Sequence, residues 1–320
     1  MRHLFIIDPL PRLLVEADTS IAFMREATRR GHGVWTSQVE GLRVGEGGRP
    51  HALASETFVK EGEPWYELGR QSVEACDAFD VVWMRKDPPV DLDFIQVVQL
   101  LTLVAPPALV VNDPFGLLSI EEKLFVLRFP ELAPPTIVSR DRAELLAFCE
   151  KLGGEMIVKP IGACGGEGVF HIVRDDRNLR ALLESATRHG TRYQIAQRYQ
   201  PEIRQGDKRV IVVEGEPIGA VLRVPQAQEA RANFHAGGSA ARAPVTARDR
   251  EICARIGPEL RRLGIVFAGI DVIGGYLTEV NVTSPTGIRE INRLEDRRLE
   301  GDVLDAVETR ARVRRGQRGN

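Results

Sequence analysis

Near its C-terminal end, at residues 269–290 (GIDVIGGYLTEVNVTSPTGIRE), the chain carries two apolar runs that flank a Gly-Gly pair. Three oxygen-bearing side chains interrupt these runs, those of Asp271, Glu279 and Asn281. Burying a carboxylate without a partner is costly, so two carboxylates and an amide in one buried hairpin indicate a cation between them. Oxygen ligands suit a hard ion, and Mg²⁺ usually takes few protein carboxylates and completes its shell with substrate phosphates. The stretch therefore predicts a platform for a metal and a nucleotide.

This metal site also constrains the register of the hairpin. Side chains alternate between the faces of a strand, so Glu279 and Asn281 point the same way. A plain two-residue turn at Gly274 and Gly275 would put Asp271 on the opposite face from Glu279. A shared metal site therefore predicts a three-residue loop or a β-bulge, with Asp271 directly opposite Glu279.

Length and composition are those of a soluble globular protein with two or three subdomains, since the chain has 320 residues, 43% apolar and 28% charged. The net charge of −2 gives no field that would attract nucleic acid or an anionic membrane. No apolar run approaches the ~20 residues of a membrane helix, and the run at the N-terminus is too short for the core of a signal peptide. The basic tail at residues 310–318 is interpreted as a solvated end, with an interaction arm as the alternative.

The four cysteines lie far apart and form no C-x-x-C pair. That spacing argues against zinc and against a disulfide framework. The spacing favours reduced thiols, and we therefore expect a cytoplasmic protein. From the net charge we expect neither a nucleic-acid nor a membrane partner.

Residues 1–118 show the pattern of an open α/β domain. Strand, helix and strand are predicted at 4–7, 19–30 and 34–36, and again, after a polar insertion at 41–63, at 79–84, 94–104 and 108–112. No G-x-G-x-x-G follows the first strand, so no dinucleotide is assigned to this domain. Arg85 lies at the carboxyl end of the strand at 79–84, where open sheets bind ligands, and we expect it to contact one.

A small α+β unit is predicted for residues 119–200. Its helices are expected at 119–129, at 178–189 and after Asp141, where Glu144 would complete a capping box, and its strands at 134–138, 156–160, 169–173 and 193–199. Lys123 lies among apolar residues of the first helix, and Lys159 ends the strand at 156–160.

A glycine run, residues 161–168 (IGACGGEG), directly follows Lys159. Glycines let backbone N–H groups face an anion, and a lysine adds a point charge. No G-K-[ST] follows, so this is not a Walker A loop. Such a run alone is equally compatible with a plain turn, and the lysines with ordinary surface lysines. Their position at strand-loop junctions favours phosphate binding.

Residues 201–320 are predicted to form a C-terminal subdomain. It would contain a hairpin turning at Glu214 and Gly215, a strand at 220–224, an aperiodic segment at 225–243, a helix at 248–263 and the metal hairpin. Aperiodic segments of that length are usually lids or disordered. Arg209 and Arg223 border the apolar strands. They would either form a salt-bridged rim or neutralise carboxylate and phosphoryl oxygens.

Short motifs along nearly the whole chain, to about residue 308, resemble in their order those of bacterial glutathione synthetases, a family of the ATP-grasp superfamily. They are 84–89 (MRKDPP), Asn112, 122–125 (EKLF), 158–160 (VKP), Gly165 with Gly166, 189–193 (HGTRY), 206–210 (GDKRV), 214–217 (EGEP), 278–286 (TEVNVTSPT) and 288–290 (IRE). The resemblance implies an ATP-grasp fold of α/β and α+β type, preceded by an open α/β (pre-ATP-grasp) domain.

The resemblance also implies an ATP-dependent carboxylate-amine ligase that joins γ-glutamylcysteine and glycine through an acyl phosphate, working as a homotetramer. The implied site residues are Arg209, Arg223 and Arg231 for catalysis; Lys123, Lys159, Gly165, Gly166, Gln197, Tyr199 and Asp207 for ATP; Arg85, Asn281, Ser284 and Thr286 for the substrates; and Asp271, Glu279 and Asn281 for two Mg²⁺ ions, replaceable by Mn²⁺.

One segment departs from the family pattern. At 225–234 the chain reads PQAQEARANF, with alanines where the family has glycines. Alanine restricts the positive-φ conformers that glycine adopts, so a lid built from this segment would close more stiffly. Two alternatives follow: an ATP-grasp ligase with a different amino-acid donor or acceptor, or an ATP-binding regulator that has lost catalysis.

Overall fold

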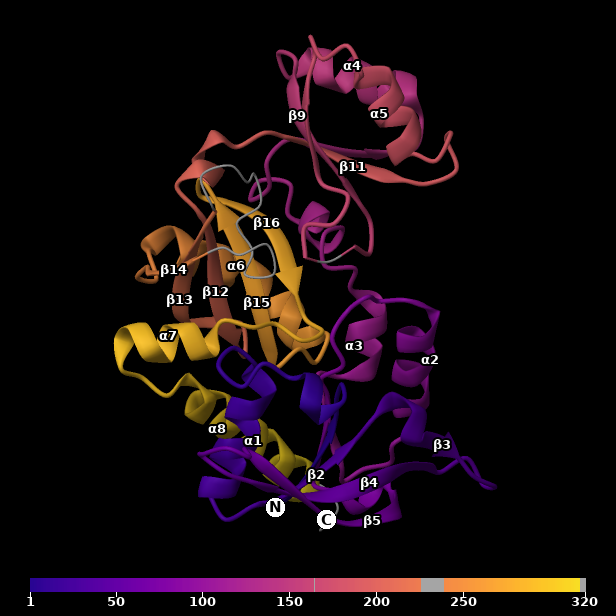
Figure 1. The fold of residues 1–320 in the computed structure, drawn as a ribbon, viewed down its shortest axis with the longest axis vertical. Helices are drawn as coiled ribbons and strands as arrows, with labels where there is room; N and C mark the ends of the chain where they lie inside the picture. The colour runs from indigo at the N-terminus through magenta and orange to yellow at the C-terminus, as the bar shows by residue number, and fades with distance from the viewer. Residues whose placement is uncertain (164, 226–238, 317–320) are drawn as a thin grey trace.

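The computed structural model describes residues 1–163, 165–225 and 239–316. Three β-sheets follow one another along the long axis of the molecule (Figure 1). The N-terminal sheet lies at one end, a sheet formed by the C-terminal part of the chain lies in the middle, and a smaller sheet from the central part of the sequence lies at the other end.

The N-terminal sheet has seven strands in the order β3-β4-β2-β1-β6-β7, with β5 paired to β4. Its strands are β1 (Arg2–Ile6), β2 (Gly33–Ser37), β3 (Leu42–Val44), β4 (Pro50–Val59), β5 (Tyr66–Ala75), β6 (Val81–Met84) and β7 (Leu109–Val111), and its helices are α1 (Thr19–Arg29) and α2 (Leu92–Leu101). The predicted strand-helix-strand units are confirmed. The polar insertion is not a plain loop, because β3 and β4 lie in it. These strands pair antiparallel at the edge of the sheet, where only one face needs apolar residues.

The smaller sheet is antiparallel, in the order β10-β9-β11-β8. It consists of β8 (Thr136–Ser139), β9 (Glu155–Pro160), β10 (Phe170–Val173) and β11 (Gln194–Arg198), with helices α4 (Arg142–Lys151) and α5 (Leu179–Ala186) packed on one face. Asp141 caps α4 as predicted, but the capping box is wrong. The Glu144 carboxylate accepts a hydrogen bond from Ser139 Oγ, and it is Ser139 Oγ that accepts the N–H of Asp141.

The middle sheet is also antiparallel, in the order β14-β13-β12-β15-β16. Its strands are β12 (Asp207–Val213), β13 (Glu216–Val224), β14 (Ser239–Arg242), β15 (Phe267–Ile273) and β16 (Tyr276–Asn281); helices α6 (Ala247–Arg262) and α7 (Ile288–Glu295) accompany it. The turn at Glu214 and Gly215 is confirmed. The aperiodic segment predicted at 225–243 is wrong for its last residues, because β14 pairs with β13 there. Residues 226–238 lie outside the described residues.

The helix predicted at 119–129 is wrong. Helix α3 (Pro114–Ser119) ends at the residue where the predicted helix would begin. A turn at residues 121–124 then leads into a short 3-10 helix, η4 (Phe125–Arg128). The Glu121 carboxylate accepts hydrogen bonds from the N–H groups of Lys123 and Leu124, which closes the turn. A side chain that bonds nearby backbone in this way competes with the helix.

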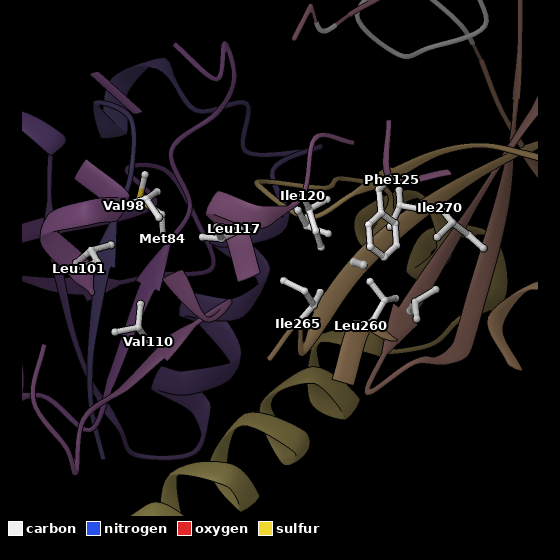
Figure 2. Packing of buried hydrophobic residues seen from close by; sticks show 14 of the residues in the cluster. Met84, Val98, Leu101, Val110, Leu117, Ile120, Phe125, Leu260, Ile265 and Ile270 are labelled. Atoms are coloured by element: carbon white, nitrogen blue, oxygen red, sulfur yellow. The ribbon is translucent and has the colours of Figure 1, made fainter. Parts of the chain in front are cut away.

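The segment from α3 to η4 packs against the middle sheet and its helix, not against the smaller sheet. Figure 2 shows this part of the core, where Ile120 and Phe125 lie beside Leu260, Ile265 and Ile270. The segment thereby carries Lys123 to β16. The domain limits at about 118 and 200 stay predictions.

The C-terminal helix α8 (Leu299–Gly316) returns to the N-terminal sheet and packs beside α1. Glu26 of α1 is 1% exposed and binds three guanidinium groups, those of Arg29, Arg30 and Arg298. Burial by itself would raise the pKa of Glu26, but hydrogen bonds from Arg29 and Arg30 lower the pKa to about 2.

We expect Glu26→Gln to lower the free energy of unfolding by about 2–3 kcal/mol at neutral pH, since one pKa unit corresponds to about 1.4 kcal/mol. Because the folded-state pKa lies below the ordinary value, the contribution is present above that value and is lost as the pH falls toward 2. The difference from wild type should therefore narrow below about pH 4.5 in urea titrations. The control is Glu61→Gln. Glu61 is exposed and pairs with Arg25, which lies on α1 like Glu26, and its substitution should change the free energy of unfolding by less than about 1 kcal/mol. Equal stability of Glu26→Gln and wild type at neutral pH would contradict the assignment.

Within the described ranges, no helix combines the length and the apolar character needed to cross a membrane.

Candidate active site

The hairpin of β15 and β16 has the predicted register. Asp271 pairs with Glu279, and the pairing shifts by one residue between Asp271 and Val272. The extra residue is Thr278, whose hydroxyl donates to the carbonyl of Asp271 at 3.1 Å. The turn itself contains only Gly274 and Gly275, at φ 58° and 81°, values that favour glycine. The bulge therefore places Asp271 and Glu279 opposite each other, on the face that Asn281 shares.

Asp271 is buried and bound by two arginines, Arg209 from the neighbouring strand β12 and Arg223 from β13, the strand beyond it. Arg209 of β12 lies opposite it and donates to both carboxylate oxygens, and Arg223 Nη2 lies 2.9 Å from Oδ2. The amide of Asn281 donates to the same oxygen at 3.3 Å. Burial by itself would raise the pKa of Asp271, but Arg209 and Arg223 hold the pKa well below its ordinary value. Asp271 is therefore a carboxylate at any neutral pH.

Asp207 and Arg223 lie opposite each other on β12 and β13 and form a buried ion pair. Two polar atoms of this pair, Asp207 Oδ1 and Arg223 Nε, have no hydrogen-bond partner in the part of the chain that the structure describes. Burial raises the pKa of Asp207 to about 7, against the opposing effect of Arg223. Buried polar atoms without partners are costly, so a polar ligand is expected to satisfy them.

Lys123 and Lys159 converge on Glu279 from two different elements. Their ammonium groups lie 3.9 and 4.0 Å from Glu279 Oε1, and both side chains are largely buried. Lys159 Nζ also donates to the carbonyl of Thr278 at 3.4 Å, and Lys123 Nζ donates to the carbonyl of Ala163. Burial lowers the pKa of Lys159, while Glu279 acts in the opposite direction. Two cations beside one carboxylate form a site with room for further negative charge.

The glycine run continues from Lys159 as a turn. Gly165 and Gly166 have φ of 63° and 77°, which favours glycine, and the N–H of Gly162 donates to Glu121 Oε1. Residue 164 lies outside the described residues. The loop thus adjoins Lys123 and Lys159, as a phosphate-binding role requires.

Two of the residues predicted to bind ATP, Gln197 and Tyr199, lie at the end of β11. Gln197 pairs with Ile157, two residues before Lys159, so Gln197 and Lys159 share a face of the sheet. Its amide donates to Thr136 Oγ1 at 2.9 Å. Tyr199 stacks on His171 with ring centroids 4.2 Å apart. Their role in nucleotide binding stays a prediction.

Of the predicted substrate residues, Ser284 and Thr286 lie in the chain that follows β16, Asn281 ends that strand, and Arg85 follows β6. Arg85 is buried, and its guanidinium donates to Ser20 Oγ and to the carbonyls of Thr283 and Pro285 at 3.0, 3.5 and 3.3 Å. Arg209 Nη1 donates to the carbonyl of Thr286 at 3.1 Å. Arg85 therefore braces the stretch that contains Ser284 and Thr286. Its binding of the dipeptide stays a prediction.

Arg231 and nearly all of the alanine-containing segment, apart from Pro225, lie outside the described residues. The roles predicted for them stay predictions.

Two residues that sequence reasoning left without a role hold the same stretch. Asn112, after β7, uses its amide to bind the carbonyls of Phe267 and Val282 and the N–H groups of Val266 and Phe267. Glu122 binds the N–H groups of Val282 and Thr283. Asn112 was marked in the sequence by its place at the end of an apolar strand, and both Asn112 and Glu122 belong to the motifs that resemble the family, but no feature of those motifs indicated that they bind the chain after β16.

The oxygen-bearing side chains of the hairpin fit a hard divalent cation that takes most of its coordinating oxygens from a bound phosphate compound. In the ranges the structure covers, no three His, Cys, Asp or Glu side chains are placed to hold an ion by themselves. The available oxygens are those of Asp271, Glu279 and Asn281, on one face of the hairpin. Such a set suits an ion whose shell is completed by phosphate oxygens.

Comparison with known families agrees with this geometry. Residues 1–117 match the N-terminal domain of prokaryotic glutathione synthetase, and residues 122–296 match its ATP-grasp domain. A glutathione synthetase of Gloeobacter violaceus is 44% identical over 95% of this chain and 96% of the relative, and one of Mesorhizobium japonicum is 42% identical over 94% and 96%.

Similar solved structures, several of them ATP-grasp ligases, have low sequence identity and show the fold alone. The ATP-grasp ligase PsnB with its minimal precursor has a TM-score of 0.65 at 16% identity, covering 96% of this chain and 98% of that chain. The D-cycloserine synthetase DcsG has a TM-score of 0.64 at 16% identity, with coverage of 96% and 99%. The family matches, the curated relatives and the fold lead to one conclusion: the chain belongs to the prokaryotic glutathione synthetases, a family of ATP-grasp ligases that use ATP and a divalent metal.

Proposed function

We propose that the protein joins γ-glutamylcysteine and glycine to glutathione, with ATP converted to ADP and phosphate. The observation that carries the proposal is the hairpin of β15 and β16, which presents Asp271, Glu279 and Asn281 on one face beside two buried lysines. The family membership supplies the identity of the two substrates.

In the proposed reaction, a carboxylate oxygen of the cysteinyl residue attacks the γ-phosphorus of ATP, and ADP leaves. The glycine amine then attacks the carbonyl carbon of the acyl phosphate, loses a proton and expels phosphate. Lys123 and Lys159 bind the phosphates, Gly165 and Gly166 offer backbone N–H groups, and Gln197, Tyr199 and Asp207 also bind ATP. Arg209, Arg223 and Arg231 neutralise the reacting carboxylate and phosphoryl oxygens.

The metal would be held by Asp271, Glu279 and Asn281, and we propose two Mg²⁺ ions, replaceable by Mn²⁺. When bound, such ions spread the charge that develops on the phosphoryl oxygens. The protein side chains orient the phosphates, and their burial keeps water from the acyl phosphate. Arg85, Asn281, Ser284 and Thr286 would line the substrate pocket.

We further infer a homotetramer, by the family resemblance alone. A cytoplasmic location is supported by Cys76, Cys149 and Cys253, which are buried free thiols. The net charge of −2 supports small-molecule substrates without a nucleic-acid partner.

The test is ADP release from the purified protein with Mg-ATP, γ-glutamylcysteine and glycine, each omitted in turn. We expect release only with the complete set, together with glutathione identified by mass. Release with a different amine or carboxylate in place of these substrates would indicate a ligase of other specificity. ATP binding without release under any combination would indicate a regulator and would contradict the proposal.

A further inference from the structure

The turn at residues 121–124 connects the glycine loop to the metal hairpin. On the loop side, Glu121 accepts the N–H of Gly162 at 3.0 Å, and Lys123 Nζ donates to the carbonyl of Ala163. Glu121 also accepts hydrogen bonds from the N–H groups of Lys123 and Leu124, so the carboxylate of the first residue of the turn closes the turn. The turn is therefore rigidly attached to the phosphate loop.

Glu122 makes the matching attachment on the hairpin side. Its Oε1 accepts the N–H of Val282 at 2.9 Å, the N–H of Thr283 at 3.2 Å and the Thr283 hydroxyl at 3.0 Å. Its backbone carbonyl accepts the N–H of Val280 at 2.9 Å. Strand β16 is the edge of its sheet, so Glu122 supplies the bonds that a further strand would otherwise supply.

This anchoring determines where Lys123 starts. Lys123 is the next residue in the chain. Its flexible four-carbon side chain extends from that backbone and places the ammonium group 3.9 Å from Glu279 Oε1. Glu279 lies three residues before Val282 on the strand that Glu122 binds. Without the Glu122 side chain, the turn would keep its bonds to the glycine loop but, of its bonds to the hairpin described above, only the one from the Val280 N–H to the Glu122 carbonyl.

We propose that Glu122 is a positioning residue that holds Lys123 in register with Glu279, so that the phosphate-binding lysine and the metal carboxylate meet at one nucleotide. The inference rests on the proposed function only in that Lys123 and Glu279 act on ATP and its metal. It does not depend on which carboxylate and amine are joined.

The test compares Mg-ATP affinity, measured by calorimetric titration without other substrates, in Glu122→Leu, Glu122→Gln and wild type. Glu122→Leu keeps the bulk but loses the acceptor, and we expect its Kd to rise at least about tenfold. Glu122→Gln offers an amide oxygen at the same place and should stay within about threefold of wild type. Glu144→Leu is the matched control: its carboxylate accepts a hydrogen bond from Ser139 Oγ beside the smaller sheet, and its Kd should equal that of wild type.

A second comparison separates positioning from a general loss of stability. In a Lys123→Met background, Glu122→Leu should change the Kd by less than about twofold, because its effect passes through Lys123. The same tenfold loss in both backgrounds, or wild-type affinity in Glu122→Leu, would overturn the proposal. If thermal unfolding shows that Glu122→Leu does not fold, Thr283→Val removes one of the three bonds, and an unchanged Kd in that variant would overturn it. These experiments measure only nucleotide binding. A protein that binds Mg-ATP but makes no glutathione would therefore refute the proposed function, while the Kd values of the Glu122 variants would still test the positioning role.

Discussion

Glu279→Gln is expected to lower kcat at least about 100-fold, the loss typical when one group that stabilises transition-state charge is removed. Glutamine has the same shape but no charge, so the two lysines lose the carboxylate on which they converge, and the proposed metal loses a charged ligand. The Glu279 side chain is 26% exposed, so its neutralisation should change the free energy of unfolding by less than about 1 kcal/mol.

The measurement is the steady-state rate of ADP release at saturating substrates, together with a urea titration. Glu216→Gln, an exposed substitution on β13 of the same sheet, is the control and should keep the wild-type rate. A wild-type rate in Glu279→Gln would remove this residue from the metal site.

Asp271→Asn is expected to lower kcat by a similar factor but, unlike Glu279→Gln, also to destabilise the fold. Arg209 and Arg223 are buried against this carboxylate, and removing one partner of a buried ion pair costs about 3–5 kcal/mol. Because the arginines depress the pKa of Asp271, the contribution is present above the ordinary carboxyl pKa and is lost only in acid. Between about pH 5 and pH 8 the stability difference from wild type should therefore persist, modulated by the titration of Asp207, whose raised pKa depends partly on the Asp271 charge, and it should shrink only below the ordinary carboxyl pKa.

Urea titrations across that range give the stability difference, and ADP release gives the rate. Asp249 is a buried aspartate on α6 that pairs with Lys208, outside the proposed metal set. Asp249→Asn is the control, and it should lose stability with a change in kcat of less than about tenfold. Full stability in Asp271→Asn would show that the ion pairs with Arg209 and Arg223 contribute nothing.

The metal hairpin could be predicted from the sequence because its signals are local. Two apolar runs, a Gly-Gly turn and three oxygen ligands identify the element, and the need to share one ion identifies the bulge that places Asp271 opposite Glu279. The strands of the smaller sheet follow from apolar runs in the same way.

The arrangement around Lys123 could not be predicted, since it depends on distant contacts. The apolar spacing at 119–129 is that of a helix, but Glu121 binds nearby N–H groups and closes a turn instead. Glu122 then reaches Val282, 160 residues away in the chain, and Asn112 reaches the same residue from the N-terminal domain. No local pattern specifies such partners. Arg85 shows the same limit: its place at a strand end suggested an open ligand site, whereas its guanidinium is buried against the carbonyls of Thr283 and Pro285.

The central claim is that the substrate carboxylate is phosphorylated at the site formed by the β15–β16 hairpin and its lysines. It is tested most directly by following an oxygen atom. With γ-glutamylcysteine labelled by ¹⁸O in the cysteinyl carboxylate, attack of that carboxylate on ATP followed by attack of the amine transfers one labelled oxygen to phosphate. We predict one ¹⁸O atom in each phosphate released, measured by mass spectrometry. Unlabelled phosphate formed together with glutathione would contradict the account.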